Sequence, residues 1–296
     1  MAWRGVHITQ AARLSLADAQ IVVSREDGDI RLPIEDVAWM VIDTPQASLS
    51  TALLSACMDA GMVIVTTDRT HTPSGMILPF HRHHRQAEIA AMQVGISAPL
   101  KKRIWQTVVV AKIANQIAAL EIIGQDATAL RSMMHLVGSG DPTNVEARAA
   151  REYWPRLFNA FIRDDVNDKR NALLNYGYAV VRSAVARALV AAGLLPAFGV
   201  KHASITNAFN LADDMVEPFR PFVDCAVWTL TDQGRTGQGA TTVEERRALA
   251  SLLTEETRLS DETVTLLSAT ERVADSLVRV MEMASVPLLL LPRLER

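Results

Sequence analysis

Three short segments of the sequence carry side chains that could together bind a divalent metal ion. The first contains Glu146, the second contains His202, and the third contains Asp214 and Glu217. Two carboxylates and one imidazole form a mixed oxygen and nitrogen ligand set that suits Mg²⁺ or Mn²⁺, whereas structural zinc sites are usually rich in cysteine. Such an ion can polarise a phosphodiester and orient an attacking 3′-hydroxyl or water. The residue types therefore favour metal-dependent phosphodiester chemistry.

Each segment also has an explanation that involves no catalysis. Thr143 followed by Glu146 matches a capping box at the start of a helix. His202 follows a turn rich in glycine, and a loop histidine is most often held by hydrogen bonds. Asp214 and Glu217 lie three residues apart on one helical face, and the proline after Glu217 indicates a kink or an end there, as in a solvated acidic turn. Spacing alone leaves both interpretations open.

The elements that must position these side chains change in type along the chain. Apolar runs that are typical of strands occupy 20–24, 29–34, 37–42, 62–66 and 76–80; a hairpin turn lies at 26–28, and one helix near 48–60 starts at Ser48 or Ser50 and stops at Gly61. Helical periodicity then follows near 99–123, 126–137, 143–160, 168–192, 203–230, 242–255 and 260–284, and residues 231–240 form a glycine-rich loop. The sequence predicts an α+β protein, with a β-sheet-rich N-terminal domain (1–85) and a larger all-helical catalytic domain (86–296).

Charge is distributed unevenly. The chain of 296 residues has a formal net charge of −3, yet the stretch from His81 to Lys112 has one acid, Glu88, against six basic residues: Arg82, Arg85, Lys101, Lys102, Arg103 and Lys112. This island indicates either a DNA-binding track or a solvated helix face. Two further basic residues, Lys201 and Arg220, lie beside candidate ligands in the sequence and could hold flanking phosphates.

Several classes of protein are disfavoured. No glycine-rich Walker or Rossmann loop is present, which argues against an ATPase or a dehydrogenase. Cys57 and Cys225 are the only cysteines, both in apolar surroundings, so we expect two buried free thiols. The first residues lack the continuous apolar stretch of a signal peptide, and no apolar window could span a membrane. We therefore expect a cytoplasmic globular protein without a membrane segment.

Four segments, in this order, resemble the CRISPR-associated protein 1 family, the integrases of CRISPR adaptation. They are NVEARAAREYW from Asn144, NALLNYGYA from Asn171, GLLPAFGVKH from Gly193 and DMVEPFRPFVD from Asp214. The resemblance, to short type II-like members, implies that Glu146, His202 and Glu217 are the catalytic metal ligands for Mg²⁺ or Mn²⁺. Asp214 remains a substitute ligand, or a partner that orients His202.

The resemblance further implies a function and partners. A homodimer would join CRISPR-associated protein 2, and also contact the effector nuclease, to hold double-stranded DNA whose 3′-hydroxyl attacks the leader-repeat by transesterification. We assign dimerisation and DNA contact to the N-terminal domain, and DNA binding to Arg82, Arg85, Lys101, Lys102, Arg103, Lys201 and Arg220. Three alternatives stay open: a non-catalytic helical DNA-binding scaffold, a nuclease acting on branched DNA, and a transposon-type integrase on the same fold.

Overall fold

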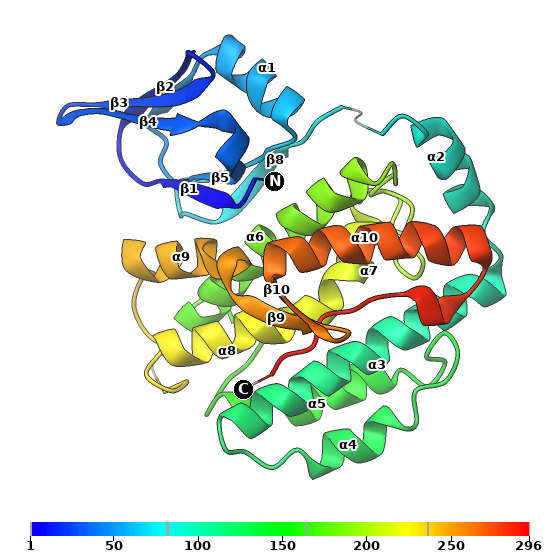
Figure 1. Cartoon of the computed structure of the whole chain (residues 1–296). Coiled ribbons are helices and arrows are strands. Elements are labelled where there is room, and N and C mark those ends of the chain that lie inside the picture. The colour runs from blue at the N-terminus through cyan, green and yellow to red at the C-terminus, as the bar shows by residue number, and fades with distance from the viewer. Residues whose placement is uncertain (1, 81–82, 164, 236, 296) are drawn as a thin grey trace.

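The computed structural model describes residues 2–80, 83–163, 165–235 and 237–295. Strands form the N-terminal part and helices form most of the remainder (Figure 1). This order confirms the α+β class expected from the sequence. Strand β8 ends at Ile77 and helix α2 begins at Gln86, while the division of the chain into domains at residue 85 stays a prediction.

The N-terminal part contains two four-stranded sheets. One has the order β4-β3-β2-β6 and the other the order β1-β5-β7-β8, in which β1, β5 and β7 are parallel. The elements are β1 (Arg4–Ile8), β2 (Ala12–Ala17), β3 (Gln20–Arg25), β4 (Gly28–Pro33), η1 (Ile34–Asp36), β5 (Val37–Ile42), β6 (Ala47–Leu49), α1 (Thr51–Ala60), β7 (Val63–Thr67) and β8 (Pro73–Ile77). The sequence prediction missed β1, β2 and β6, and placed β8 three residues too late.

Helix α1 has the limits expected from its sequence. The Ser50 side chain accepts a hydrogen bond from the backbone N–H of Leu53, and Gly61 ends the helix with φ 74°, a conformation that glycine adopts easily. The predicted hairpin is also confirmed, because Arg25 pairs with Gly28 across a two-residue turn between β3 and β4. Local sequence therefore determines these two features.

Strand β5 connects the two parts of the protein, because all six of its residues are buried. Met40 and Ile42 join the core between the two sheets and α1, whereas Trp39 and Val41 pack in the larger core of the helical part. The Trp39 indole N–H donates to the carbonyl of Ala250 at 3.0 Å. Both faces of this strand are therefore buried against other parts of the protein, which explains its continuous apolar run.

The helical part is built around two long helices, α3 and α6, with α10 beside α6 (Figure 1). Its elements are α2 (Gln86–Gly95), α3 (Ala98–Ile122), α4 (Thr128–Met134), α5 (Val145–Leu157), α6 (Lys169–Ala191), α7 (Asn210–Val216), η2 (Glu217–Phe219), α8 (Arg220–Leu230), α9 (Val243–Ala250), η3 (Leu252–Thr254), β9 (Glu256–Leu259), β10 (Glu262–Thr265), α10 (Leu266–Met283) and η4 (Val286–Leu288). Among the described residues, no helix is long and apolar enough to cross a membrane.

Three expectations for this part are wrong. It is not all-helical, because it contains the antiparallel hairpin β9–β10, of which β10 occupies residues expected to be helical and β9 lies between two expected helices. The helix expected at 203–230 begins only at Asn210, whose side-chain amide donates to the carbonyls of Ala197, Ser204 and Asn207 and so stabilises a loop. Cys57 is buried as expected, but Cys225 is only half-buried; both are free.

A buried ionic group, here called the Asp43 cluster, links the sheets to the helices. Its members are His7 in β1, Asp43 after β5, Thr67 in β7, His71 before β8 and Arg246 in α9. The Asp43 carboxylate accepts hydrogen bonds from Arg246 Nε at 2.6 Å and from His71 Nδ1 at 2.7 Å. Burial favours a raised pKa for Asp43, but the hydrogen bonds from His7, Arg246 and His71 outweigh it and hold the pKa well below its usual range.

Candidate metal-binding site

Glu146 lies in the first turn of α5, and of its two possible roles the capping box is not formed among the described residues. The residue preceding the helix is Asn144, with φ 51°, and its side chain makes no capping bond. The Asp141 carboxylate instead accepts hydrogen bonds from the backbone N–H groups of Val145, at 2.8 Å, and of Glu146, at 3.0 Å. The Glu146 carboxylate is therefore not needed as a cap, and it points to Lys112 of α3, with its Oε1 2.6 Å from the lysine Nζ.

Glu217 begins the short 3-10 turn η2 between α7 and α8, and it is buried. Its Oε2 lies 2.5 Å from Lys112 Nζ, and its Oε1 lies 2.9 Å from Arg220 Nε. Burial favours a raised pKa for Glu217, but the charges of Lys112 and Arg220 outweigh this effect and lower the pKa. The Oε2 atom is fully buried, so its short contact with the Lys112 ammonium compensates for the loss of water around it.

Lys112 thus joins two carboxylates that are far apart in the sequence, and we call these three residues the Lys112 cluster. The lysine side chain is 12% exposed, with apolar neighbours such as Val108, Val109 and Ile113 along its own helix. Burial favours a lowered pKa for the Lys112 ammonium, but Glu217 and Glu146 outweigh it and raise the pKa. The ammonium therefore stays charged and holds both acids.

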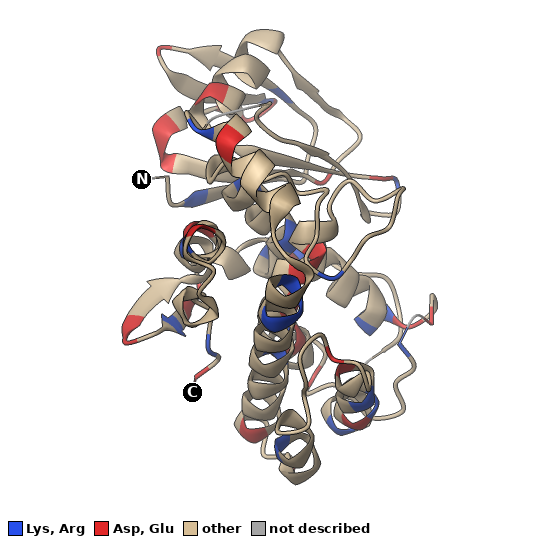
Figure 2. Ribbon diagram, turned by 90° about the vertical axis from the view of Figure 1, so that its right-hand side faces the viewer, with Lys and Arg blue, Asp and Glu red and all other residues tan. Residues whose placement is uncertain are grey.

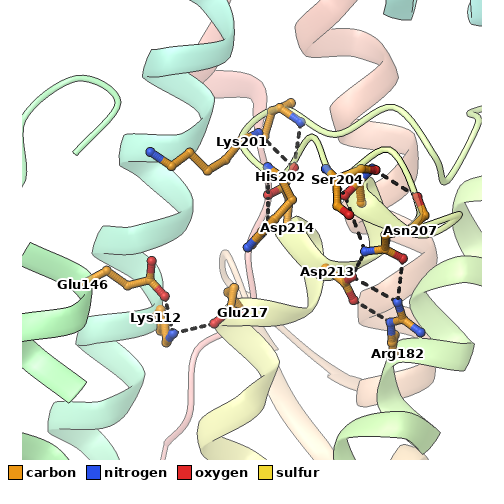
Figure 3. Close-up of polar contacts among 12 residues, drawn as sticks. Lys112, Glu146, Arg182, Lys201, His202, Ser204, Asn207, Asp213, Asp214 and Glu217 are labelled. Carbon is orange, nitrogen blue, oxygen red and sulfur yellow. Dashed lines mark hydrogen bonds and ion pairs between the residues drawn. The ribbon is translucent and has the colours of Figure 1, made fainter. Parts of the chain in front are cut away.

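His202 and Asp214 form a second pair beside the Lys112 cluster (Figure 3). The Asp214 carboxylate lies 2.7 Å from His202 Nδ1 and also accepts from the backbone N–H groups of Val200, Lys201 and His202. A Cβ atom at Gly199 would lie 2.6 Å from an Asp214 oxygen, so the tight loop requires glycine there. The hydrogen bond to Asp214 raises the pKa of His202, against the opposing effect of burial.

The predicted ligands meet on one side of the helical part. Figure 3 shows Glu146, Lys112 and Glu217 linked in a row, with His202 next to them. His202 and Glu217 are close enough to shift each other's pKa. Among the described residues, however, no three His, Cys, Asp or Glu side chains form a ready metal-binding group, because Lys112 lies between the two glutamates.

The acids near Glu217 have different partners. Asp214 is completely buried and bonded to the His202 loop, while Asp213 pairs with Arg182 of α6 through a contact of 2.5 Å. Neither carboxylate therefore takes part in the Lys112 cluster. The contact of Asp214 with His202 favours the orienting role, one of the two left open by the sequence, which stays a prediction.

Aromatic and polar side chains line one side of the site, and the sequence prediction missed them. Arg220 lies over the ring of Tyr178, with its guanidinium carbon 4.6 Å from the ring centroid. The hydroxyls of Tyr178 and Tyr153 both donate to the buried carboxylate of Asp224. Burial raises the pKa of Asp224 to about 6, although these two hydrogen bonds oppose the shift. The tyrosines stand in the predicted motifs, but only tertiary structure shows that they converge.

The basic residues expected to bind DNA fall into three groups. Lys101, Lys102 and Arg103 lie in the first turns of α3, and within the described part of the chain none of them forms an ion pair. Figure 2 colours the described Lys and Arg residues blue and the described Asp and Glu residues red. Arg85 pairs with Glu88 and with Glu282. Arg82 lies outside the described residues.

Lys201 and Arg220 lie close to the candidate ligands, as expected from their sequence neighbours. Lys201 is exposed, and its ammonium lies 3.5 Å from the carbonyl of Gly140. Arg220 pairs with Glu217 and is 30% exposed, so its guanidinium can be reached from the solvent. Both cations therefore flank the site.

Comparison with solved structures defines the fold. The chain is similar to a casposase bound to its integration product, with a TM-score of 0.78, 17% identity and coverage of 96% of this chain and 92% of that one. It is also similar to a chain of a Cas6-RT-Cas1–Cas2 complex, with a TM-score of 0.75, 17% identity and coverage of 96% and 35%. At these identities the similarity shows the fold, in which strands precede a larger helical part.

Sequence comparison then gives the family. The chain belongs to the family of CRISPR associated protein Cas1, whose model matches residues 6–260. It is 42% identical over 238 residues to the CRISPR-associated endonuclease Cas1 of Neisseria meningitidis serogroup C, and the match covers 79% of this chain and 78% of that protein. The family expected from the four sequence segments is therefore confirmed.

Proposed function

We propose that this chain is a metal-dependent DNA integrase and endonuclease of CRISPR adaptation, which inserts short protospacer DNA into a repeat array by 3′-hydroxyl transesterification. The observation that carries this proposal is that Glu146 and Glu217 meet at a single buried cation, beside a histidine fixed by Asp214. Membership of the Cas1 family, with relatives named as endonucleases, supports the chemistry. No nucleotide cofactor is needed, because one phosphodiester replaces another.

The donor set fits Mg²⁺ or Mn²⁺. Glu146 and Glu217 would supply oxygens and His202 would supply an imidazole nitrogen, a combination suited to these ions. The buried Glu217 Oε2, which contacts Lys112, would become available as a ligand once that ammonium moves away. When bound, the ion would polarise the scissile phosphate and stabilise the charge that develops on it.

The neighbouring residues would orient the ligands and the DNA. The Asp214 carboxylate accepts a hydrogen bond from His202 Nδ1, so Nε2 is the nitrogen that can bind a metal. A carboxylate bonded to a metal-binding histidine is a common arrangement. Arg220 and Lys201 would hold phosphates on either side of the reacting one, and such contacts position DNA without reading its sequence. We propose Lys101, Lys102 and Arg103 as part of the path of the duplex, joined by Arg82 and Arg85.

The proposal includes an assembly. A homodimer would use its N-terminal domain, residues 1–85, for dimerisation and DNA contact, and its helical domain, residues 86–296, for catalysis. It would bind double-stranded DNA and a Cas2 protein, and it would contact the effector nuclease. The similarity to chains in a Cas6-RT-Cas1–Cas2 complex and in a casposase bound to its integration product supports the first two partners. The cytoplasmic location expected from the sequence stays a prediction.

A strand-transfer assay tests the proposed function. The purified chain and its Cas2 partner are incubated with a 3′-hydroxyl duplex and a supercoiled plasmid that carries a leader and a repeat. We expect product with Mg²⁺ or Mn²⁺ and none with EDTA. His202→Ala and Glu217→Gln should each lose at least about a hundredfold in rate, because losing a ligand costs more than losing the group that orients it. Glu152→Gln, on the same helix as Glu146 but paired with Arg156, should keep the wild-type rate.

The outcome separates the alternatives. Unchanged rates in His202→Ala and Glu217→Gln would contradict the metal assignment and favour a non-catalytic DNA-binding scaffold. The similarity in fold to a casposase makes a transposon-type integrase the second candidate. That candidate predicts equal integration into plasmids with and without the leader and repeat, and a preference for donor duplexes that carry terminal inverted repeats.

A further inference from the structure

The Lys112 ammonium occupies the position next to the two carboxylates that a bound metal ion would also need. It lies within 2.6 Å of carboxylate oxygens on both Glu146 and Glu217, the two acids that we propose as metal ligands. Both acids have a single negative charge, and Lys112 alone reduces the net charge of the three groups to −1. A divalent ion bound to the same oxygens would repel an ammonium that remained there. The ammonium must therefore leave at least one carboxylate when a metal binds.

The structure offers an acceptor on the same helix face to which the ammonium can move. Lys112 and Gln116 are one turn apart on α3 and thus share a helix face. Both line a pocket of about 260 Å³ beside Glu217, together with Tyr178, Arg220 and Asp224. Gln116 is 3% exposed, and its Oε1 has no hydrogen-bond partner among the described residues. A buried amide oxygen without a donor is unfavourable, so this atom is an open acceptor for an ammonium.

We infer that Lys112 is a positioning residue with two states: without metal its ammonium holds Glu146 and Glu217 together, and when metal binds it moves to Gln116 Oε1. This inference rests on the proposed function, because it assumes that the two glutamates are metal ligands. The lysine keeps the carboxylates from repelling each other before metal arrives. It also opposes metal binding, since the ion must displace it. Gln116 lessens that opposition by accepting the displaced ammonium.

Titration with Mn²⁺, followed by calorimetry and by thermal unfolding, tests both states on the full chain without DNA. Lys112→Met should bind Mn²⁺ at least about tenfold more tightly than the wild type, because the competing charge is gone. Its melting temperature without metal should fall, because Glu146 loses its cation and Glu217 keeps only Arg220, and Mn²⁺ should restore it. Lys112→Arg, which keeps the charge, is the control and should not gain affinity.

The second state is tested by a double-mutant cycle. Gln116→Leu should weaken Mn²⁺ binding about tenfold in the wild-type background, because the displaced ammonium then loses the amide oxygen that accepts it. The same substitution should have no effect in the Lys112→Met background. If Lys112→Met does not fold without metal, Lys112→Gln replaces it in the cycle.

Three results would overturn the inference. The first is that the neutral Lys112 variants bind Mn²⁺ no more tightly than the wild type. The second is that Lys112→Arg gains as much affinity as they do. The third is that Gln116→Leu changes the affinity equally in the wild-type and Lys112→Met backgrounds. Failure of the proposed function looks different, because the wild type would then bind no Mn²⁺, or would bind it equally well after Glu217→Gln. A third outcome would refute only the inference and not the proposed function. In that case Glu217→Gln abolishes Mn²⁺ binding, but the Lys112 and Gln116 substitutions do not change the affinity as expected.

Discussion

Two buried ionic groups of this protein differ in how completely their carboxylates are bonded. In the Asp43 cluster, one carboxylate is surrounded by donors from the strands and from α9, and both of its oxygens accept hydrogen bonds. In the Lys112 cluster, two carboxylates share one ammonium. There, the ammonium contacts one oxygen of Glu146 and one of Glu217, and the neighbouring His202 side chain is 48% exposed.

This difference separates a structural role from a reactive one. A fully bonded carboxylate has no free lone pair for a ligand, so the Asp43 cluster can only connect the sheets to the helices. The two acids of the Lys112 cluster share one ammonium, only Glu217 has a second cation, Arg220, and an accessible imidazole lies beside them. We therefore expect mutations in the first cluster to change stability, and those in the second to change metal binding and activity.

The largest expected effect on stability comes from Asp43→Asn. The substitution leaves Arg246, 3% exposed in its side chain, as a buried cation without a charged partner. Breaking such a buried pair costs about 3–5 kcal/mol in the free energy of unfolding. Urea unfolding measures the difference. Asp27→Asn, which removes an exposed ion pair with Arg25, is the control and should change stability by less than about 0.5 kcal/mol.

The pH dependence of the Asp43 effect has a definite sign. The partners of Asp43 lower its pKa in the folded state, so its contribution to stability is present above the unfolded pKa of about 3.9 and is lost as the pH falls below that value. The advantage of the wild type over Asp43→Asn should therefore not shrink between pH 8 and pH 5, and should decrease below about pH 4. A difference that stayed constant down to pH 2 would contradict this account.

A smaller effect is expected from Asp214→Asn, which keeps the size of the side chain but removes its charge. Loss of the group that orients a metal-bound histidine typically reduces metal affinity about 10- to 100-fold. Calorimetric titration with Mn²⁺ measures the change. Asp213→Asn is the matched control, because Asp213 pairs with Arg182 and does not contact His202. An equal loss in the two variants would show that Asp214 has no special relation to the histidine.

The smallest expected effect concerns the basic turns of α3. Replacing Lys101, Lys102 and Arg103 together by glutamine should reduce the slope of log affinity against log salt concentration by up to about three, one for each lost phosphate contact. Fluorescence anisotropy with a duplex at several salt concentrations measures the slope. As a control, two exposed arginines of α10, Arg272 and Arg279, are replaced by glutamine, and this change should leave the slope unchanged. An unaltered slope in the triple variant would make this part of α3 a solvated face.

The sequence predicts the parts of the fold that local interactions determine. Ser50 and Gly61 delimit α1 because each acts on its own turn, and the hairpin at Arg25 and Gly28 depends on a two-residue turn. The helix expected at 203–230 was wrong because the Asn210 side chain bonds to carbonyls of a loop, an interaction that hydrophobic periodicity cannot detect. Short strands such as β9 and β10 are stabilised by their neighbours and have weak local signals.

The site was predicted in part. Glu146, His202 and Glu217 could be named because their motifs resemble a family, and the structure brings them to one side of the helical part. Lys112 was missed as a member of the site, although a lysine within the apolar stretch of α3 is a signal that it has a buried partner. Its two partners come from α5 and η2, so only the folded chain shows the contact.

A crystal structure with Mn²⁺, with the ion located by its anomalous scattering, tests the central claim most directly. We expect one strong peak coordinated by Glu146, His202 and Glu217, with the Lys112 ammonium no longer bridging the two glutamates. A peak bound by other residues, or a bridging Lys112 at saturating Mn²⁺ with no peak at the three ligands, would contradict the account.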